Sequence, residues 1–256
     1  KVKQAIKDPA IATPQLPSAK VKLPWLAEPI SMKVLMFYHS RPHIFGCQFS
    51  NLFYSPITAN TRWIVPTKDN TIQTLLKYEK PNLENGDSNL LEFKSSESIF
   101  QAAKAEKQGD AMFVHALSPG DAARAGQGRM KMSNKQANRY KDEFGGNPFK
   151  IANNHWQFRE NEKRYKVRAN WHEYKIEIMN YALRLKFQRY YKWMKEYVES
   201  EEPVYFVEHT KNDTQWADGS NGYGTNYLGK LLTAMCWEFR MLREEQKKKE
   251  KVESVE

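Results

Sequence analysis

The sequence predicts a mixed α and β fold in which helices dominate. Two short apolar segments rich in β-branched and aromatic residues, VLMFY (34–38) and PVYFVEH (203–209), predict buried strands. A helix is predicted over 97–117, between a serine pair and a Ser-Pro-Gly turn. Apolar residues that recur every three or four positions predict two further helices, over 171–185 and 228–242.

Composition narrows the class of protein. The chain has 256 residues with a formal net charge of +10, a hydrophobic content of 40% and no window near the ~20 apolar residues of a membrane helix. Its two cysteines, Cys47 and Cys236, and the absence of a signal-peptide pattern lead us to expect an intracellular, cytoplasmic protein with no membrane partner. The basic excess favours a polyanionic partner, although it also serves solubility.

The expected organisation is one compact domain with two insertions. The domain covers 31–245 and is preceded by a proline-rich arm, 1–30, that we expect to be extended on the surface. The insertions lie at about 60–89 and 130–168. A charged tail, 246–256, is expected to fray from the helix before it.

The second insertion has a composition that suits nucleic acid. Residues 129–168 hold eleven Lys and Arg against four acids, and aromatic residues are interleaved with the charges. Cations can bind phosphates while rings stack on bases, which predicts a nucleic-acid contact. The alternative, weighed equally, is that the rings pack onto the domain while the charges stay solvated. The rings are Tyr140, Phe144, Phe149, Trp156, Phe158 and Tyr165.

The start of the 97–117 helix places polar side chains together. At helical spacing, Glu97, Gln101 and Lys104 share one face, and Phe100 points to another. A Glu in the first turn is also what helix capping favours, so Glu97 alone has a structural explanation. Further along, Arg124 lies in a small-residue stretch, SPGDAARAGQGR, that could approach a ligand closely or pack as a helix.

Two segments near Cys47 have residues that could form a site. Ser50 and Asn51 lie between aromatic residues, where they could line a pocket for a base or ribose or bond the backbone of a turn. His39, His43 and Cys47 are spaced four apart, but a proline and a glycine interrupt any helix there. We therefore expect no metal site.

The loop HTKNDTQWADGSNGYGTNYLG (209–229) combines acids and glycines between a predicted strand and a predicted helix. Asp213 and Asp218 are its acids, and Gly219 and Gly222 precede Asn226, an N-cap candidate. Free backbone N–H groups and the positive end of the helix would face an anion here, such as a phosphate. An ordinary surface turn is the alternative.

The order of these motifs resembles the NADAR family, also called YbiA-like. The matching blocks are 34–59, 92–130 and 169–243, with Glu-x-x-Phe-Gln and Trp-x-Asp-Gly…Asn-x-Leu-Gly as their strongest parts. The resemblance implies a compact, mostly helical α+β domain that hydrolyses N-glycosidic bonds of ribose phosphates without a cofactor. Family substrates include an early riboflavin-pathway intermediate and ADP-ribose attached to guanine, also in DNA.

The motif match also implies site residues. The catalytic set would be Glu97, Trp171 and an acid of the loop, Asp213 or Asp218. This chain departs from the family where Ser98-Ile99 replaces His-Tyr, and where Ala217 replaces a glycine and should not need a positive φ. The implied substrate-binding residues are Phe37, Tyr38, Ser50, Asn51, Phe100, Gln101, Lys104, Arg124, Trp216, Gly219, Gly222 and Asn226.

Cleavage of a ribosyl bond gives these residues plausible chemistry, because positive charge builds on the sugar as the base departs. Glu97 could stabilise that charge or orient water, an aspartate could hold ribose hydroxyls, and Trp171 could stack on the base. We expect removal of ADP-ribose from ADP-ribosylated guanine in nucleic acid or a nucleotide. The alternatives are hydrolysis of the riboflavin intermediate, or a module that binds ADP-ribose or nucleic acid without catalysis.

Overall fold

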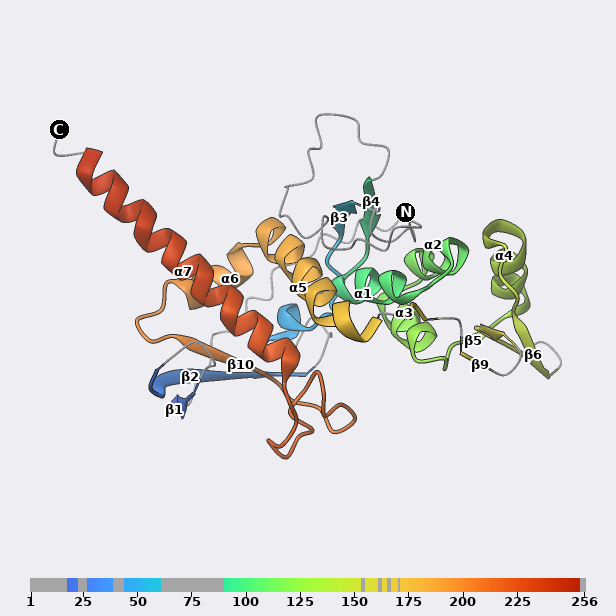
Figure 1. The fold of residues 1–256 in the computed structure, drawn as a ribbon, viewed down its shortest axis with the longest axis horizontal. Helices are drawn as coiled ribbons and strands as arrows, with labels where there is room; N and C mark the ends of the chain where they lie inside the picture. Colours follow the sequence, from blue (N-terminus) through green and yellow to red (C-terminus); the bar gives the residue numbers. More distant parts are fainter. Residues whose placement is uncertain are drawn as a thin grey trace. The chain divides into compact units, whose positions relative to one another are not determined.

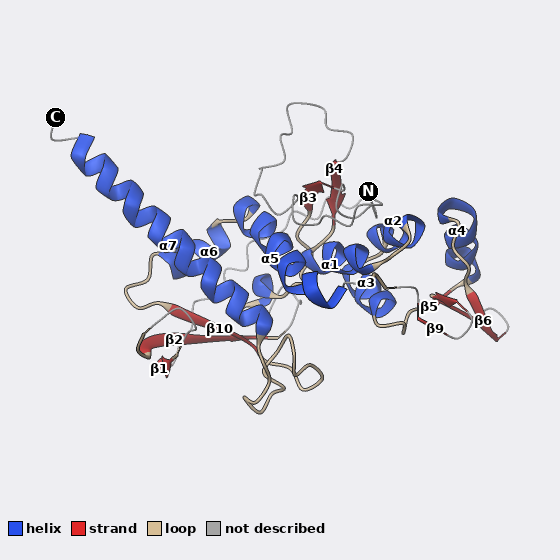
Figure 2. Cartoon of the chain, viewed as in Figure 1, coloured by secondary structure: helices blue, strands red, loops and turns tan. Residues whose placement is uncertain are grey.

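The structure is a computed structural model. It describes residues 18–22, 27–38, 44–60, 90–152, 155–160, 163–164, 167–169 and 171–253. Residues 61–89 of the first predicted insertion and most of the proline-rich arm lie outside these ranges, as do His39, His43 and Tyr165. The described residues form helices and short strands in an α+β arrangement in which helices dominate (Figure 2), as the sequence predicts.

Contacts divide the chain into two compact units, which are described in turn. The first unit joins the two ends of the chain, Lys1–Phe53 and Tyr190–Glu256, and the second is Tyr54–Arg189. Among the helices labelled in Figure 1, α6 and α7 belong to the first unit. Helices α1 to α5 belong to the second unit.

The first unit is built on a three-stranded sheet of order β1-β2-β10, formed by β1 (Ser18–Val21), β2 (Ile30–Phe37) and β10 (Val204–Glu208). β1 is antiparallel to β2, and β10 is parallel to it, with Glu208 opposite Phe37. The strands predicted at 34–38 and 203–209 are confirmed, and their parallel pairing directs both carboxyl ends to the same edge.

Aromatic packing covers this sheet. The short 3-10 helix η1 (Cys47–Phe49) places Phe49 against Phe206, with 4.8 Å between ring centroids, and against Tyr197 of α6 (Lys192–Val198) at 5.3 Å. The long helix α7 (Tyr227–Glu253) packs on β10. Phe49 and Phe206 are fully buried, so these contacts form the core of the unit.

The charged tail differs from the prediction. Residues from Gln246 onward were expected to fray, but α7 continues to Glu253. Side chains one turn apart support the exposed part of the helix: Lys247 pairs with Glu244 at 2.8 Å, and Gln246 donates to Glu250 at 3.0 Å. Such pairs favour helix in a sequence of good helix formers.

The second unit is a cluster of helices with a hairpin of two short strands. The central helix α1 contacts its neighbours α2, α3 and α5. The hairpin pairs its strands in antiparallel fashion. The bounds are β3 (Ile57–Asn60), β4 (Leu90–Phe93), α1 (Ser96–Lys104), α2 (Gln108–Ala116), α3 (Pro119–Gly126) and α5 (Trp171–Arg189).

The single helix predicted over 97–117 is wrong, because the chain breaks between α1 and α2. Ala105 is extended, with ψ 137°, and forms an isolated bridge with Val167. Arg168 donates its backbone N–H to the Lys104 carbonyl at 3.2 Å and its Nε to the Ala105 carbonyl at 3.1 Å. A segment distant in sequence therefore takes the carbonyls that end α1, and periodicity within 97–117 could not indicate this.

The predicted second insertion forms α4 (Asn134–Phe144) and five short strands. Three of the strands make a sheet of order β5-β7-β6, and the other two form a hairpin. A capping box starts α4, since Ser133 and Gln136 bond each other's backbone N–H. The strands are β5 (Lys131–Met132), β6 (Phe149–Ala152), β7 (His155–Gln157), β8 (Arg159–Glu160) and β9 (Lys163–Arg164).

Aromatic side chains dock this insertion onto α2. Phe113 of α2 contacts Tyr140 at 4.5 Å and stacks on Phe158 at 5.3 Å between ring centroids. The Tyr140 hydroxyl donates to the buried Asp110 carboxylate at 2.5 Å. Tyr140 and Phe158 thus pack onto the rest of the unit, which was the alternative to a nucleic-acid contact. Because both rings are buried, they cannot stack on a base.

Replacement of Tyr140 by Phe tests this docking. The substitution removes the hydroxyl from a buried carboxylate, so we expect the free energy of unfolding to fall by about 1–3 kcal/mol. Chemical denaturation followed by circular dichroism measures it. The matched control is Tyr54→Phe, at a tyrosine that is 52% exposed, with an expected change below about 0.5 kcal/mol. Equal stability of the two variants would contradict the docking role.

Candidate functional site

The candidate residues of the second unit centre on a buried carboxylate in α1. Glu97 and Gln101 are each only 6% exposed, and Gln101 Nε2 donates to Glu97 Oε1 at 2.8 Å. The N-cap of this helix is Ser95, whose side chain accepts from the Ser98 N–H. Ser95 thus provides the cap, and capping does not account for the burial of the Glu97 carboxylate in the first turn.

Gln101 is held in place by a glycine of α3. A Cβ on Gly126 would lie 1.6 Å from Gln101 Oε1, so only a glycine leaves room for this amide. Lys104 Nζ donates to the Gly126 carbonyl at 2.6 Å, which fixes the end of α3 against α1. Gln101 Oε1 is buried without a hydrogen-bond partner among the described residues. Gly126 therefore determines how Gln101 presents its amide to Glu97.

Trp171 begins α5 and packs on the same helix. Its ring meets Phe100 edge to face, with 4.8 Å between centroids, and it is 6% exposed. The backbone N–H of Trp171 donates to the Arg168 carbonyl at 3.1 Å, so the α1 break and the start of α5 are linked. The structure thus brings Glu97, Gln101, Phe100 and Trp171 onto one pair of contacting helices.

Arg124 occupies the exposed side of α3. It pairs with Asp121 at 2.5 Å, and more than half of its side chain is exposed. Burial opposes ionisation of Asp121, but hydrogen bonds from Ser118 and Arg124 and the charge of Arg124 outweigh it, so the pKa of Asp121 is lowered. This pair organises the start of the helix, and the substrate-binding role of Arg124 stays a prediction.

The remaining candidates lie in the first unit, at the carboxyl ends of β2 and β10. Phe37 is fully buried against Phe49, which makes it a core residue. Tyr38, the next residue, is 52% exposed at the strand end. Ser50 accepts from the Leu52 N–H at 3.3 Å, as expected of a turn, and Asn51 is half-buried beside it.

The two aspartates of the loop after β10 fold it in different ways. Asp213 is half-buried, and its Oδ1 accepts from the N–H groups of Gln215 and Trp216 at 2.9 and 2.7 Å. Asp218 is 7% exposed; its Oδ1 accepts from the Ser220 N–H, and its Oδ2 lies 2.8 Å from His209 Nδ1. Both carboxylate oxygens of Asp218 therefore have a hydrogen-bond partner among the described residues, whereas only Oδ1 of Asp213 has one.

The prediction that free backbone N–H groups at the start of α7 form a phosphate cradle is not met, because those N–H groups bond within the loop. The start of α7 is capped by carbonyls of its own loop: Tyr227 donates to Gln215 at 3.1 Å, and Leu228 to Trp216 at 3.0 Å. The N–H groups of 224–226 also donate within the loop, at 2.7 to 3.0 Å. These donors are consumed by folding of the loop, so side chains must supply most contacts to an anion here.

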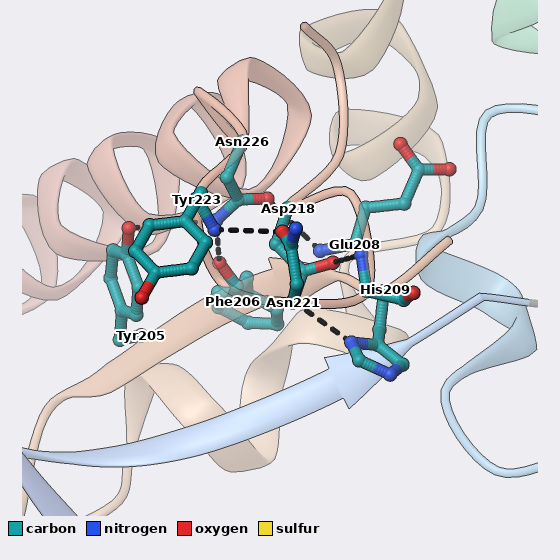
Figure 3. Close-up of polar contacts among 9 residues, drawn as sticks. Tyr205, Phe206, Glu208, His209, Asp218, Asn221, Tyr223 and Asn226 are labelled. Carbon is teal, nitrogen blue, oxygen red and sulfur yellow. Dashed lines mark hydrogen bonds and ion pairs between the residues drawn. The ribbon is translucent and has the colours of Figure 1, made fainter. Parts of the chain in front are cut away.

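Glycines and Asn226 shape the loop. Gly219 and Gly222 have positive φ, 71° and 81°, while Ala217 does not, as expected. Asn226 is buried, and its side chain accepts from the Glu208 N–H and donates to the Phe206 carbonyl, each at 3.0 Å (Figure 3). Asn226 thus fastens the loop to β10, and its amide is occupied by that contact.

Comparison with known proteins identifies the family of the chain. The NADAR domain family matches residues 36–240, which is most of the sequence. The chain belongs to the NADAR domain family.

Individual relatives match over shorter stretches. The chain is 42% identical over 66 residues to "N-glycosidase YbiA" of Shigella boydii and 41% identical over 66 residues to that of Escherichia coli, covering 26% of the chain and 41% of each relative. It therefore spans about two fifths of the length of these relatives. It is also 38% identical over 73 residues to "Riboflavin biosynthesis protein PYRR, chloroplastic" of Arabidopsis thaliana, covering 28% of the chain and 12% of that protein.

One solved structure is also similar. The NMR structure of the E. coli protein YbiA aligns with a TM-score of 0.49 and 23% identity, over 84% of this chain and 86% of that one.

Within the described residues, no group of three His, Cys, Asp or Glu side chains could hold a metal ion, and no helix could cross a membrane.

His209 is a NADAR-domain residue of this chain that the sequence interpretation did not select. It follows β10 directly and bonds a candidate acid, yet it was quoted only as part of the loop motif. An ionisable side chain at the carboxyl end of a predicted parallel strand was the available signal, because ligands often bind at that end of strands.

The contact between Gly126 and Gln101 gives a prediction for this NADAR domain. Gly126→Ala would push Gln101 away from Glu97, so we expect a fall in the free energy of unfolding of about 1–3 kcal/mol. Gly120→Ala is the matched control in the same helix, since its nearest neighbour would be Arg124 Nη1 at 3.8 Å. Thermal unfolding measured on both variants checks this; equal stability would contradict it.

Proposed function

We propose that this protein is an N-glycosidase that removes ADP-ribose from ADP-ribosylated guanine in nucleic acid or a nucleotide. The observation that carries the proposal is the buried Glu97–Gln101 pair beside Trp171, in a NADAR domain whose relatives include N-glycosidases. Burial of a carboxylate costs free energy that its hydrogen bonds must offset, and buried acids of this kind are common at catalytic sites.

In this proposal Glu97 acts on the sugar. The ribosyl carbon gains positive charge as the bond to the base breaks, and a carboxylate with little competing water stabilises that charge or positions the attacking water. The amide of Gln101 fixes one carboxylate oxygen, so less reorientation is needed during the reaction. Trp171 and Phe100 are buried on the same two helices, so they give the region an apolar environment that excludes water.

Within the first unit, the loop geometry favours Asp213 over Asp218 as the aspartate that can accept a hydrogen bond from a ligand. Asp213 Oδ2 makes no hydrogen bond to the residues that the structure describes, whereas both oxygens of Asp218 are occupied. Asp213 is also the more exposed of the two. A carboxylate oxygen available to substrate can accept from a hydroxyl without breaking the loop.

A nucleic-acid carrier is supported by the exposed cations of residues 129–168. Arg129, Lys131, Lys135 and Lys150 are all exposed there, while the rings of Tyr140 and Phe158 are buried. We therefore propose contact through phosphates and not through base stacking on those rings.

A substrate panel tests the function. The protein is incubated with ADP-ribosylated DNA, ADP-ribosylated RNA, an ADP-ribosylated guanine nucleotide and a phosphoribosylamino-pyrimidine, and released products are identified by mass spectrometry. We expect release of ADP-ribose from the guanine substrates. Turnover of the pyrimidine alone would support the riboflavin alternative, which the similarity to PYRR favours. Binding without turnover would indicate a non-catalytic module.

Substitution of Glu97 tests the mechanism. Glu97→Gln keeps an acceptor for Gln101 Nε2 but removes the charge, so we expect turnover to fall about 10²- to 10⁴-fold while thermal stability is kept. The control is Glu92→Gln in β4, whose side chain is 61% exposed and which should retain activity. A fully active Glu97→Gln protein would remove Glu97 from the mechanism.

The carrier contact predicts a salt effect. Replacement of the exposed Lys131 and Lys135 by Gln should raise the KM for an ADP-ribosylated oligonucleotide several-fold, and reduce its dependence on salt, without changing the KM for a free nucleotide. The matched control replaces Lys248 and Lys249, exposed on α7. Equal effects of both pairs would show that net charge, and not this surface, is responsible.

A further inference from the structure

Arg168 joins the end of α1 to the start of α5, and all three lie within the second unit. The Arg168 backbone N–H donates to the Lys104 carbonyl at 3.2 Å, and its Nε donates to the carbonyl of buried Ala105 at 3.1 Å. The Arg168 carbonyl in turn accepts from the Trp171 N–H at 3.1 Å. This one residue therefore contacts both helices that carry the proposed catalytic region.

These contacts are made at a helix end that needs partners. The last carbonyls of an α-helix have no N–H partner inside the helix. Ala105, the C-cap of α1, is extended and pairs with Val167 in an isolated antiparallel bridge. The Arg168 side chain also brings a positive charge to the negative end of the α1 dipole. Residues 167–168 thus fix the end of α1 through contacts that α1 itself could not supply.

A second contact between the two helices lies about one turn away. The rings of Phe100 and Trp171 meet edge to face with 4.8 Å between centroids, and both residues are 6% exposed. Phe100 precedes Lys104 by four residues, which corresponds to ~6 Å along the axis of α1. α1 and α5 lie side by side (Figure 1). Two contacts separated along the axis fix the tilt of α5 on α1, whereas the ring contact alone would let α5 pivot.

The tilt of α5 matters for the Glu97 carboxylate. Glu97 lies less than one turn before Phe100 in α1, and its Oε1 accepts from Gln101 Nε2 at 2.8 Å. The buried rings of Phe100 and Trp171 exclude water from this region. A carboxylate acts more strongly on a developing positive charge when little water competes. A shift of Trp171 would admit water and weaken that effect.

We propose that Arg168 is a positioning residue, which sets the place of Trp171 against α1 and thereby keeps water from the Glu97 carboxylate. Its importance for turnover rests on the proposed N-glycosidase function. The placement of Trp171 does not, because it follows from contacts within the protein. Arg168 touches no reacting atom in this proposal and acts through Trp171.

Two uncharged variants of Arg168 isolate the hydrogen bond of its side chain. Arg168→Gln has an amide N–H at the position of Nε, whereas Arg168→Met has a methyl group there. They therefore differ in the bond to the Ala105 carbonyl and not in charge. With a free nucleotide substrate, we expect kcat of Arg168→Met to fall about 10- to 10²-fold with little change in KM. Arg168→Gln should keep at least about a third of the wild-type kcat.

The indole of Trp171 provides a readout that needs no substrate. The chain has seven tryptophans, so nitrogen labelling of tryptophan gives an NMR cross peak for each indole N–H, and Trp171→Phe identifies the peak of Trp171. We expect this peak to shift in Arg168→Met and to stay near its wild-type position in Arg168→Gln. If Arg168 only stabilised the fold, Arg168→Met would melt at a lower temperature without moving the peak or kcat.

Arg139→Met is the matched control. Arg139 also lies in the second unit, its side chain is 49% exposed, and it pairs with Glu143 at 2.8 Å on α4. The control should leave both the Trp171 peak and kcat for the free nucleotide unchanged. Circular dichroism verifies the fold of each variant. If Arg168→Met does not fold, Arg168→Lys repeats the comparison, because it keeps the charge at the helix end but has a carbon at the position of Nε.

The outcomes separate this inference from the proposed function. A shifted Trp171 peak and a reduced kcat in Arg168→Met, both restored in Arg168→Gln, support the two together. If the wild type turns over substrate but Arg168→Met keeps its kcat and an unshifted peak, or Arg168→Gln loses as much kcat as Arg168→Met, the inference is overturned and the proposed function stands. If the wild type releases no base while the peak shifts as expected, the placement of Trp171 by Arg168 stands and the proposed function fails.

Discussion

The parallel pairing of β2 with β10 is the constraint on which the first unit depends. It joins segments about 170 residues apart and sends both carboxyl ends to one edge, where Tyr38, His209 and the long loop begin. Asn226 secures the return of the chain, because its buried amide bonds the backbone of β10 on both the donor and the acceptor side. Strand pairing and one side-chain amide thus set where α7 can start and how Asp218 meets His209.

Satisfaction of backbone hydrogen bonds decides what the loop can bind. A helix start has free N–H groups that suit an anion, but here the loop's own carbonyls occupy those of Tyr227 and Leu228. The loop gains rigidity from these bonds, and contacts to an anion would fall mainly to its side chains. A glycine-rich sequence therefore served close folding of the loop on itself more than approach of a phosphate to the backbone.

In the second unit, burial of polar groups is the feature that needs a reason. α1 is buried on all sides, and Ser96, Glu97 and Gln101 are buried with it. Apolar residues at those positions would stabilise the helix packing more, since buried polar groups lose hydration. Gly126 adapts α3 to the Gln101 amide, and Phe100 and Trp171 supply the apolar side of the same region. The proposed catalytic role of the Glu97 carboxylate would account for its burial.

The sequence by itself determined the elements whose signals are local: the strands ending near Phe37 and Glu208, the Ser95 cap, the periodic helices α5 and α7, and the order of motifs that indicates the family. Only the tertiary structure decided the break at Ala105, the burial of Glu97, the use of the loop's N–H groups and the His209–Asp218 pair. Caps and periodicity act within about one or two helical turns, so the sequence shows them directly. Val167, Gly126 and Asp218 act on partners that folding brings close, and no local pattern encodes those distances.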